Sequence, residues 1–255
     1  MFITDKIENS IIKMQIHMKS TTSIAVLFLL FTTLTSSGCM FIGGIDGNGN
    51  VIKETREISS FDAIDVGGAF NVILTQGNTE SLIIEADENL LPIIRTSVNG
   101  RTLRITTEEN IRNSKALNLF INFKDIDKLD ISGACNLECT NELSFSTLKI
   151  EASGASDIDL DLTAEILLCD YSGASEINLT GKVRECEFEV SGASEIDAYD
   201  LVAEEIELRA SGASEAKLHA TESLRIRASG ASSVRYMGDP IVDSNVSGAG
   251  SVKKR

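Results

Sequence analysis

Tryptophan is absent from this sequence, proline occurs only twice in 255 residues, and aromatic residues make up only 5% of the chain. Small and β-branched side chains must therefore fill the core, which suits thin, regular β structure better than a helical globule. Basic residues are also scarce, 23 Lys and Arg against 38 Asp and Glu, so the formal net charge is −15. Because phosphate repels such a chain over long range, we expect no nucleic-acid partner.

Metal ligands and catalytic bases are few as well. His219 is the only histidine after Met18, and we expect it in a turn between repeats. The spacing of Cys135, Cys139, Cys169 and Cys186 fits no zinc pattern, so we predict neither a metal site nor a cofactor. We interpret these four cysteines as core residues. One disulfide among them is the alternative, because export permits oxidation.

The first 39 residues have the features of a lipoprotein signal peptide. Lys19 precedes an apolar run at residues 24–31, which is too short for a membrane span of about 20 residues. Small residues then lead to Cys39, as in a bacterial lipobox, although Ser36 stands where an aliphatic residue is usual. We predict translation from Met18 and diacylation of Cys39, which would anchor the protein to a membrane. The alternative is an ordinary signal peptide with a coincidental cysteine.

Residues 40–56 follow this cysteine and are rich in glycine and asparagine. That composition is typical of a flexible tether. The sequence thus predicts three parts: a signal peptide at 1–39, a tether at 40–56 and a folded domain at 57–255.

A repeated Ser-Gly-Ala motif dominates this folded domain. It begins at seven positions, separated by 21, 19, 19, 20, 18 and 18 residues: Ser132, Ser153, Ser172, Ser191, Ser211, Ser229 and Ser247. Apolar and polar residues alternate on both sides of each motif, which indicates two strands, each with one buried face. We interpret the central glycines as repeat corners, because glycine permits a positive φ. These are Gly133, Gly154, Gly173, Gly192, Gly212, Gly230 and Gly248.

A strand–corner–strand unit of this length cannot bury its own apolar face, so it must stack on its copies about 4.8 Å apart in parallel register. We therefore predict an all-β fold, a single-stranded right-handed parallel β-helix with coils of about 18–21 residues. Residues 65–72 parallel residues 130–137 and predict a degenerate first coil. Strands at 81–86 and 102–106, joined through a turn at Asn99-Gly100, and a helical turn within 89–94 would form an irregular N-terminal cap.

One column of acidic residues follows the corners. Asp157, Glu176, Glu195 and Glu215 occupy the same place in four consecutive coils. Stacked at the coil spacing, their carboxylates would repel one another unless they are solvated, neutralised or bridged by cations. The row is thus a candidate binding or cation site, and the alternative is a solvated surface that discourages aggregation.

Several of these features together resemble one known family. They are the lipobox, the segments 61–64 and 67–70, the Ser-Gly-Ala-Ser ladder and the segment 246–253. As a set they are similar to the head GIN domain family of auto-transporter adhesins, which is common in Bacteroidetes. The resemblance covers residues 57–255 and implies a parallel β-helix and an envelope location. It brings no catalytic residues with it.

We therefore expect a cell-envelope lipoprotein that binds or displays something without catalysis. A serine repeated at one structural position, with no base in reach, is not a nucleophile. Its partners would be the membrane, through the lipid on Cys39, and a glycan, cell-wall polymer or protein. We expect the protein at the outer membrane, on either its periplasmic or its surface face. The alternative is a polysaccharide-acting enzyme of the parallel β-helix type, which would need clustered acids in a groove.

Overall fold

The computed structural model describes residues 43–255, so the predicted signal peptide and Cys39 lie outside the described residues. Residues 44–255 form one compact unit with its own core. Almost all of this unit is β-strand, and its one helical turn is the 3-10 helix η1 (Leu91–Ile93). None of the helices in residues 43–255 is long and apolar enough to cross a membrane.

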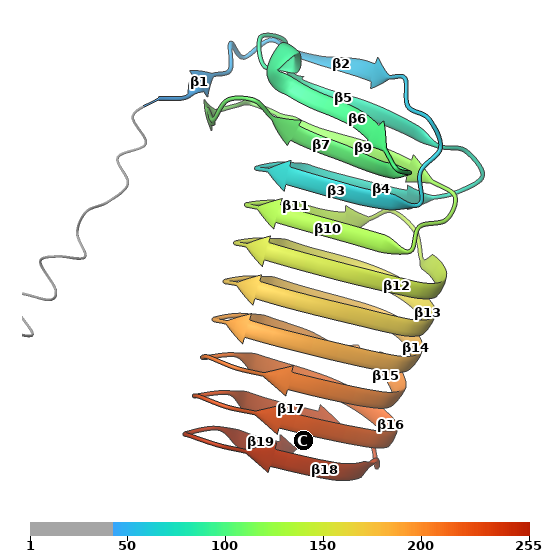
Figure 1. Ribbon diagram of the computed structural model, residues 1–255, viewed down its shortest axis with the longest axis vertical. Coiled ribbons are helices and arrows are strands. Elements are labelled where there is room, and N and C mark those ends of the chain that lie inside the picture. Colours follow the sequence, from blue (N-terminus) through green and yellow to red (C-terminus); the bar gives the residue numbers. More distant parts are fainter. Residues whose placement is uncertain (1–42) are drawn as a thin grey trace, which may run out of the picture. The chain divides into compact units, whose positions relative to one another are not determined.

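The body of this unit is a parallel β-solenoid, as predicted (Figure 1). Each coil pairs in parallel with the next, so that Ile158 lies beside Ile177, 19 residues further on, and Ile177 beside Ile196. The strands of the body are β10 (Lys128–Gly133), β11 (Asn136–Cys139), β12 (Leu143–Gly154), β13 (Asp157–Gly173), β14 (Glu176–Gly192), β15 (Glu195–Ala210), β16 (Glu215–Ala228), β17 (Ser233–Met237), β18 (Ile241–Val246) and β19 (Ser251–Lys254).

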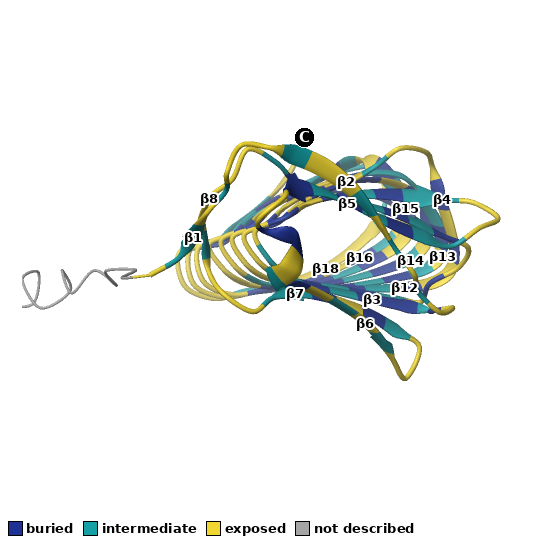
Figure 2. Ribbon diagram, turned by 90° about the horizontal axis from the view of Figure 1, so that it is seen from above, coloured by how far each residue is buried: buried dark blue, intermediate teal, exposed yellow. Residues whose placement is uncertain are grey.

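Each coil contains two straight segments that contribute to two different sheets. In β13 the residues at even positions from Ile158 to Ala164 point inward, and after a bend at Glu165 the inward positions are Leu167, Cys169 and Tyr171. At the bend the inward positions change from even to odd residue numbers. The sequence shows this change as two separate runs of alternating apolar and polar residues. Buried residues therefore line the inside of both sheets (Figure 2).

The Ser-Gly-Ala motifs form the corner between the two sheets and stack in a column, as predicted. The seven corner glycines have φ between +80° and +106°. Each lies against the glycine of the preceding coil, so that a Cβ at Gly192 would be 2.3 Å from the carbonyl oxygen of Gly173. The N–H of Ala193 donates to the same oxygen at 2.8 Å. The corner thus needs glycine for its dihedral angle and for the close approach of the coils.

The serine after each corner points into the core rather than to solvent. Five such serines are buried: Ser156, Ser175, Ser194, Ser214 and Ser232. The hydroxyls of Ser214 and Ser232 are 3.3 Å apart, and the N–H of Ser175 donates to the Ser194 hydroxyl at 3.5 Å. The repeated serine is therefore a structural column inside the corner.

The N-terminal cap is irregular, as expected. Its strands are β1 (Ile45–Asp46), β2 (Val51–Arg56), β3 (Ala63–Gly68), β4 (Asn71–Gln76), β5 (Ser81–Asp87), β6 (Ile94–Asn99), β7 (Thr102–Thr107), β8 (Ile111–Asn113) and β9 (Leu117–Phe123). Strands β3 and β4 form the predicted degenerate coil, since Gly68 pairs with Gly133 and Val72 with Leu137. Antiparallel pairs β2–β5, β5–β9 and β6–β7 complete the cap.

Three expectations about particular segments are wrong. The predicted tether at 40–56 does not extend through residues 51–56, because these form β2 and satisfy the backbone of β5. The turn at Asn99-Gly100 joins β7 to β6, a strand that the sequence pattern did not reveal, rather than to residues 81–86. His219 lies within β16 instead of a turn, and its Nδ1 is 3.1 Å from the carbonyl oxygen of Tyr199.

All four cysteines of the described residues are free thiols, and three of them are buried. Cys169 pairs with Phe188, whereas Cys186 pairs with Leu167. The two cysteines therefore sit diagonally, with Cα atoms about 8 Å apart by strand geometry, which is beyond disulfide reach. Burial raises the pKa of the Cys169 thiol to about 12, which keeps it protonated.

A buried carboxylate fastens the entering chain to the cap. Asp87 accepts hydrogen bonds from the N–H groups of Gly49 and Lys115 at 2.5 and 2.7 Å and from that of Ala116 at 3.4 Å. Burial alone would raise the pKa of Asp87, but these backbone donors outweigh it and lower the pKa from 3.8. Asp87 thus links residues before β2 with the start of β9.

The corner geometry predicts a large effect for a single methyl group. Gly192→Ala would force a Cβ onto the Gly173 carbonyl at a φ of +92°, and it should reduce the free energy of unfolding by about 2 kcal/mol or more. Gly77→Ala is the control, because its Cβ would meet nothing within 4 Å. Urea unfolding measures both, and equal effects for the two variants would contradict the corner account.

The Asp87 contacts predict a dependence of stability on pH. Because the folded-state pKa of Asp87 is lowered, its contribution is present above about pH 4 and is lost as the pH falls through the folded pKa. Asp87→Asn should destabilise the protein at pH 7, and its difference from the wild type should shrink below about pH 4. Asp125→Asn, at an exposed site, is the control in the same urea titrations. A difference that stays constant with pH would rule out the carboxylate's role.

Candidate functional site

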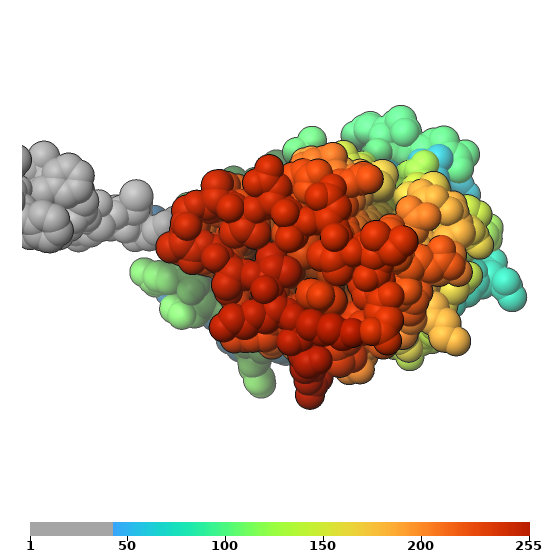
Figure 3. Space-filling view, turned by 90° about the horizontal axis from the view of Figure 1, so that it is seen from below, coloured from blue at the N-terminus to red at the C-terminus, as the bar shows by residue number. Residues whose placement is uncertain are grey.

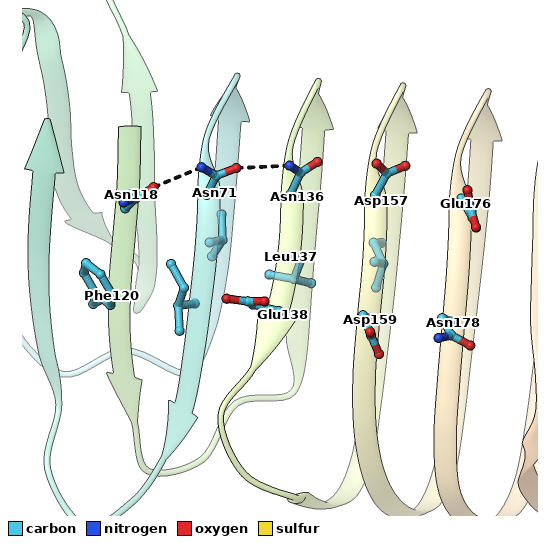
Figure 4. Close-up of a pocket in the computed structure, with 13 residues that line it drawn as sticks. Asn71, Asn118, Phe120, Asn136, Leu137, Glu138, Asp157, Asp159, Glu176 and Asn178 are labelled. Carbon is cyan, nitrogen blue, oxygen red and sulfur yellow. Dashed lines mark hydrogen bonds between the residues drawn. The ribbon is translucent and has the colours of Figure 1, made fainter. Parts of the chain in front are cut away.

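A shallow groove runs across the outer face of the sheet formed by β9, β4, β11, β13 and β14. Its volume is about 620 Å³, and carboxylates, amides and a few apolar side chains line it (Figure 4). The strands lie side by side at the coil spacing, so the groove follows the solenoid axis. Outward side chains line it in two rows because alternate residues of a strand point to the same face.

The first row contains the predicted acids. Asp157, Glu176, Glu195 and Glu215 are in register on adjacent strands, as the repeat indicates. The row continues into the cap with three asparagines that the sequence analysis missed: Asn136, Asn71 and Asn118. Asn71 and Asn136 stand at the same offset from their corner glycines as Asp157 does, so the repeat places them in the row. Asn118 follows no corner, so the repeat does not predict its position.

The second row lies two residues further along each strand. It contains Phe120, Ile73, Glu138, Asp159, Asn178, Asp197 and Lys217, each paired with the next across the strands. Its character changes from apolar in the cap to acidic in the middle and becomes basic at β16. Together the two rows place four carboxylates, those of Glu138, Asp157, Asp159 and Glu176, in the groove.

The predicted acidic row divides into a neutralised half and a free half. The Lys217 ammonium lies 2.9 Å from carboxylate oxygens of both Glu195 and Asp197. Hydrogen bonds to Asp197 and then Glu195 raise the pKa of Lys217 above its usual range. Arg235 pairs in the same way with Glu215. Within residues 43–255, the four groove carboxylates have no such ion pair.

The asparagines form a hydrogen-bonded ladder with a fixed direction. Asn71 donates to Asn118 at 2.9 Å, and Asn136 donates to Asn71 at 3.1 Å. Asn118 in turn donates to Glu85 at 2.8 Å, and this hydrogen bond is the main cause that lowers the pKa of Glu85. A carboxylate only accepts, so Glu85 sets the orientation of every amide in the ladder. The amide donors point toward the cap, and the free acceptor of Asn136 points toward Asp157.

An aromatic ring ends the groove at the cap. The Lys53 ammonium lies 4.9 Å from the centroid of the Phe120 ring and 3.4 Å from a carboxylate oxygen of Glu85. Such a cation–π contact fixes the ring in place. The groove thus runs from a held aromatic ring, past amides, to four carboxylates.

The other sheet presents a different surface. Its outward acids are interleaved with bases: Lys128 lies 2.6 Å from Glu151, and Arg209 lies 3.0 Å from Glu189. Hydrogen bonds from Lys128 and then Lys149 lower the pKa of Glu151 to about 2. Most of the outward acids of this sheet are thus paired, whereas the four groove carboxylates are not. In residues 43–255 no three His, Cys, Asp or Glu side chains are placed to hold a metal ion.

Solved structures of similar fold come from species of Parabacteroides and Bacteroides. A "putative lipid binding protein" from Parabacteroides distasonis is 25% identical, with a TM-score of 0.69 over 84% of this chain and 100% of that chain. A "putative adhesin" from Bacteroides fragilis is 24% identical, with a TM-score of 0.77 over 83% and 100%. A "putative adhesin" from Parabacteroides merdae is 23% identical, with a TM-score of 0.63 over 83% and 99%. These likenesses establish the fold.

No curated protein matches the sequence. The family described as "putative auto-transporter adhesin, head GIN domain" matches residues 60–240, which is most of the chain and includes every strand of the groove. The chain therefore belongs to the head GIN domain family.

Proposed function

We propose that this protein is a non-catalytic lipoprotein of the cell envelope, anchored through Cys39, that binds an extended glycan along the groove. Its family and its structural neighbours carry the names of adhesins and of a lipid-binding protein, which agrees with a binding module at the cell envelope. The outer membrane is the proposed site.

The observation that carries this proposal is the chemistry of the groove wall. The ladder from Glu85 to Asn136 uses one N–H of each amide internally. What remains toward the groove is mostly acceptors, namely the Asn136 carbonyl oxygen and the four carboxylates, whereas the donors are the second N–H of each ladder amide and the amide of Asn178. A matching partner must supply donors, and the hydroxyl and amino groups of sugars do so. An acidic glycan would be repelled by the four unpaired charges.

The spacing of the rows favours a glycan over an extended peptide. Equivalent side chains recur about every 4.8 Å along the solenoid axis. A chain of linked pyranose rings advances by a similar distance per sugar, so successive sugars meet equivalent acceptors. An extended peptide presents side chains on one face only about every 6.6 to 6.8 Å and falls out of step with the coils. Weak contacts repeated along a row can then add through multivalency.

Binding rather than catalysis is favoured by the likeness of the groups. General acid–base catalysis needs unlike groups that converge on one point, with environments that separate their roles. Asp157 and Glu176 instead stand on one exposed sheet face in equivalent positions of successive coils. The carboxylates of the groove thus repeat one kind of contact from coil to coil.

An array that carries both glycans and lysine-rich peptides, probed with the chain from Gly44 onward, tests the groove. The variant E138Q/D157N/D159N/E176Q should bind its selected neutral or amino glycan at least tenfold more weakly, whereas single changes should have small effects. D170N is the matched control, because Asp170 is an exposed acid on the other sheet. Selection of a lysine-rich peptide in place of any glycan would contradict the ligand class. Turnover of a polysaccharide would contradict the absence of catalysis.

The anchor is tested in the whole precursor. Mass spectrometry of the mature protein should show an acylated N-terminal Cys39, and Cys39→Ala should release the protein from the membrane fraction. The control is Cys139→Ala, which leaves the lipobox intact. Processing at another residue, with no acyl group, would refute the lipoprotein assignment without affecting the groove.

A further inference from the structure

At the C-terminal end of the described residues, the last coil of the solenoid lies uncovered (Figure 3). In residues 43–255, β18 pairs only with β16, and β19 only with β17, so each strand has one unpaired edge. Ile241 is 82% exposed and Val242 is 37% exposed. At the other end, the outermost strand β2 carries Lys53, Glu54 and Arg56, and such charges discourage pairing of an edge.

We propose that a second copy of this chain covers this end, tail to tail, with β18 pairing antiparallel to β18 and β19 antiparallel to β19. Two copies related by a twofold axis use the same patch on both sides, so the assembly closes as a dimer. Head-to-tail stacking is disfavoured, because the outermost strand at the other end, β2, belongs to the antiparallel cap and carries charged residues.

The free backbone groups define the register of this pairing. The N–H of Ser247 donates inward to Ala228, and the N–H groups of Ser251 and Arg255 donate to Ser232 and Tyr236. Alternate residues of a strand direct their backbone groups to opposite sides. The intervening residues, including Ser244 and Val252, therefore direct their N–H and C=O groups to the open edge. Each can form a hydrogen-bonded pair with its own equivalent in a second copy.

The side chains agree with pairs centred on these two residues. Centring on Ser244 sets Val242 against Val246 and Asp243 against Asn245. Centring on Val252 sets the two Val252 side chains together and Lys253 against Ser251. A register centred on Lys254 would instead bring like charges together, which is unfavourable.

One axis serves both pairs. Ser244 and Val252 each stand four residues from the corner Gly248, and the strands on either side of a corner run in opposite directions on the two sheets. The two residues thus lie across from each other, and a twofold axis roughly normal to both sheets passes near both. The pairing buries Val242, Val246 and Val252 of both copies and covers the edges.

The dimer would place both grooves on the same side. The axis is roughly normal to the groove sheet, to which β19 belongs through β17 and β16, so the second copy's groove faces the same direction. If the proposed function holds, one long glycan could contact both grooves, which raises the overall affinity through effective concentration.

Analytical ultracentrifugation of the chain from Gly44 onward tests the dimer. Ser244→Pro removes an N–H that no strand within residues 43–255 uses, so it should raise the dimer dissociation constant at least tenfold. Ser244→Ala keeps that N–H and is the matched control, expected to dimerise as the wild type does. A wild-type chain that stays monomeric throughout the measured concentrations, or equal dissociation constants for both variants, would overturn the proposal.

A spin label gives a readout that does not depend on Ser244. In a Cys139→Ser background, a nitroxide on Asn245→Cys should lie beside its equivalent, with backbones within about 10 Å, and show dipolar broadening. A nitroxide on Thr79→Cys, in the cap, should show none. Broadening at Thr79 and not at Asn245 would overturn the tail-to-tail arrangement. Glycan binding can be absent while this test succeeds, so the two proposals fail separately.

Discussion

The contact between a corner glycine and the carbonyl oxygen of the glycine one coil earlier sets the geometry of the whole solenoid. A coil can come this close only because Gly173 and Gly192 have no side chain, and the N–H of Ala193 then bonds across the gap at 2.8 Å. Once two corners are locked in this way, both flanking strands have only one register. The inward apolar residues and the outward polar residues are then aligned over every coil.

The groove is a product of this alignment. Asp157 and Glu176 face the same way because their corners stack, and the amides of Asn71 and Asn136 join the same row for the same reason. The site is distinguished by the point along the rows at which basic residues no longer pair with the carboxylates. Lys217 and Arg235 pair with the acids of the later coils, so within the two rows the unpaired carboxylates are those beside the asparagine ladder. The row is thus regular in geometry, but its carboxylates are paired in the later coils and unpaired in the groove.

The repetitive body could be predicted from sequence because one short repeated motif gives the length of the coil and the position of the corner, and the alternation around it indicates the buried faces. The cap could not, because β2 and β6 pair antiparallel with strands far along the chain and follow no period. Asp87 gave no signal, since its partners are backbone N–H groups brought from residues 49, 115 and 116. The register of the acidic row follows from the repeat, but the row by itself does not reveal Lys217, which neutralises Glu195 from the neighbouring row.

The nearly constant coil also makes length an independent variable in the evolution of this fold. Ile158 and Ile177 occupy equivalent positions 19 residues apart, so an in-frame deletion or duplication of one such segment would join strands that already share partners and inward faces. Recombination between copies of the repeat would then change the number of coils without creating a new core. Each added or lost coil would carry one outward residue in each row, so the length and charge of the surface could diverge between relatives while the corner stays unchanged.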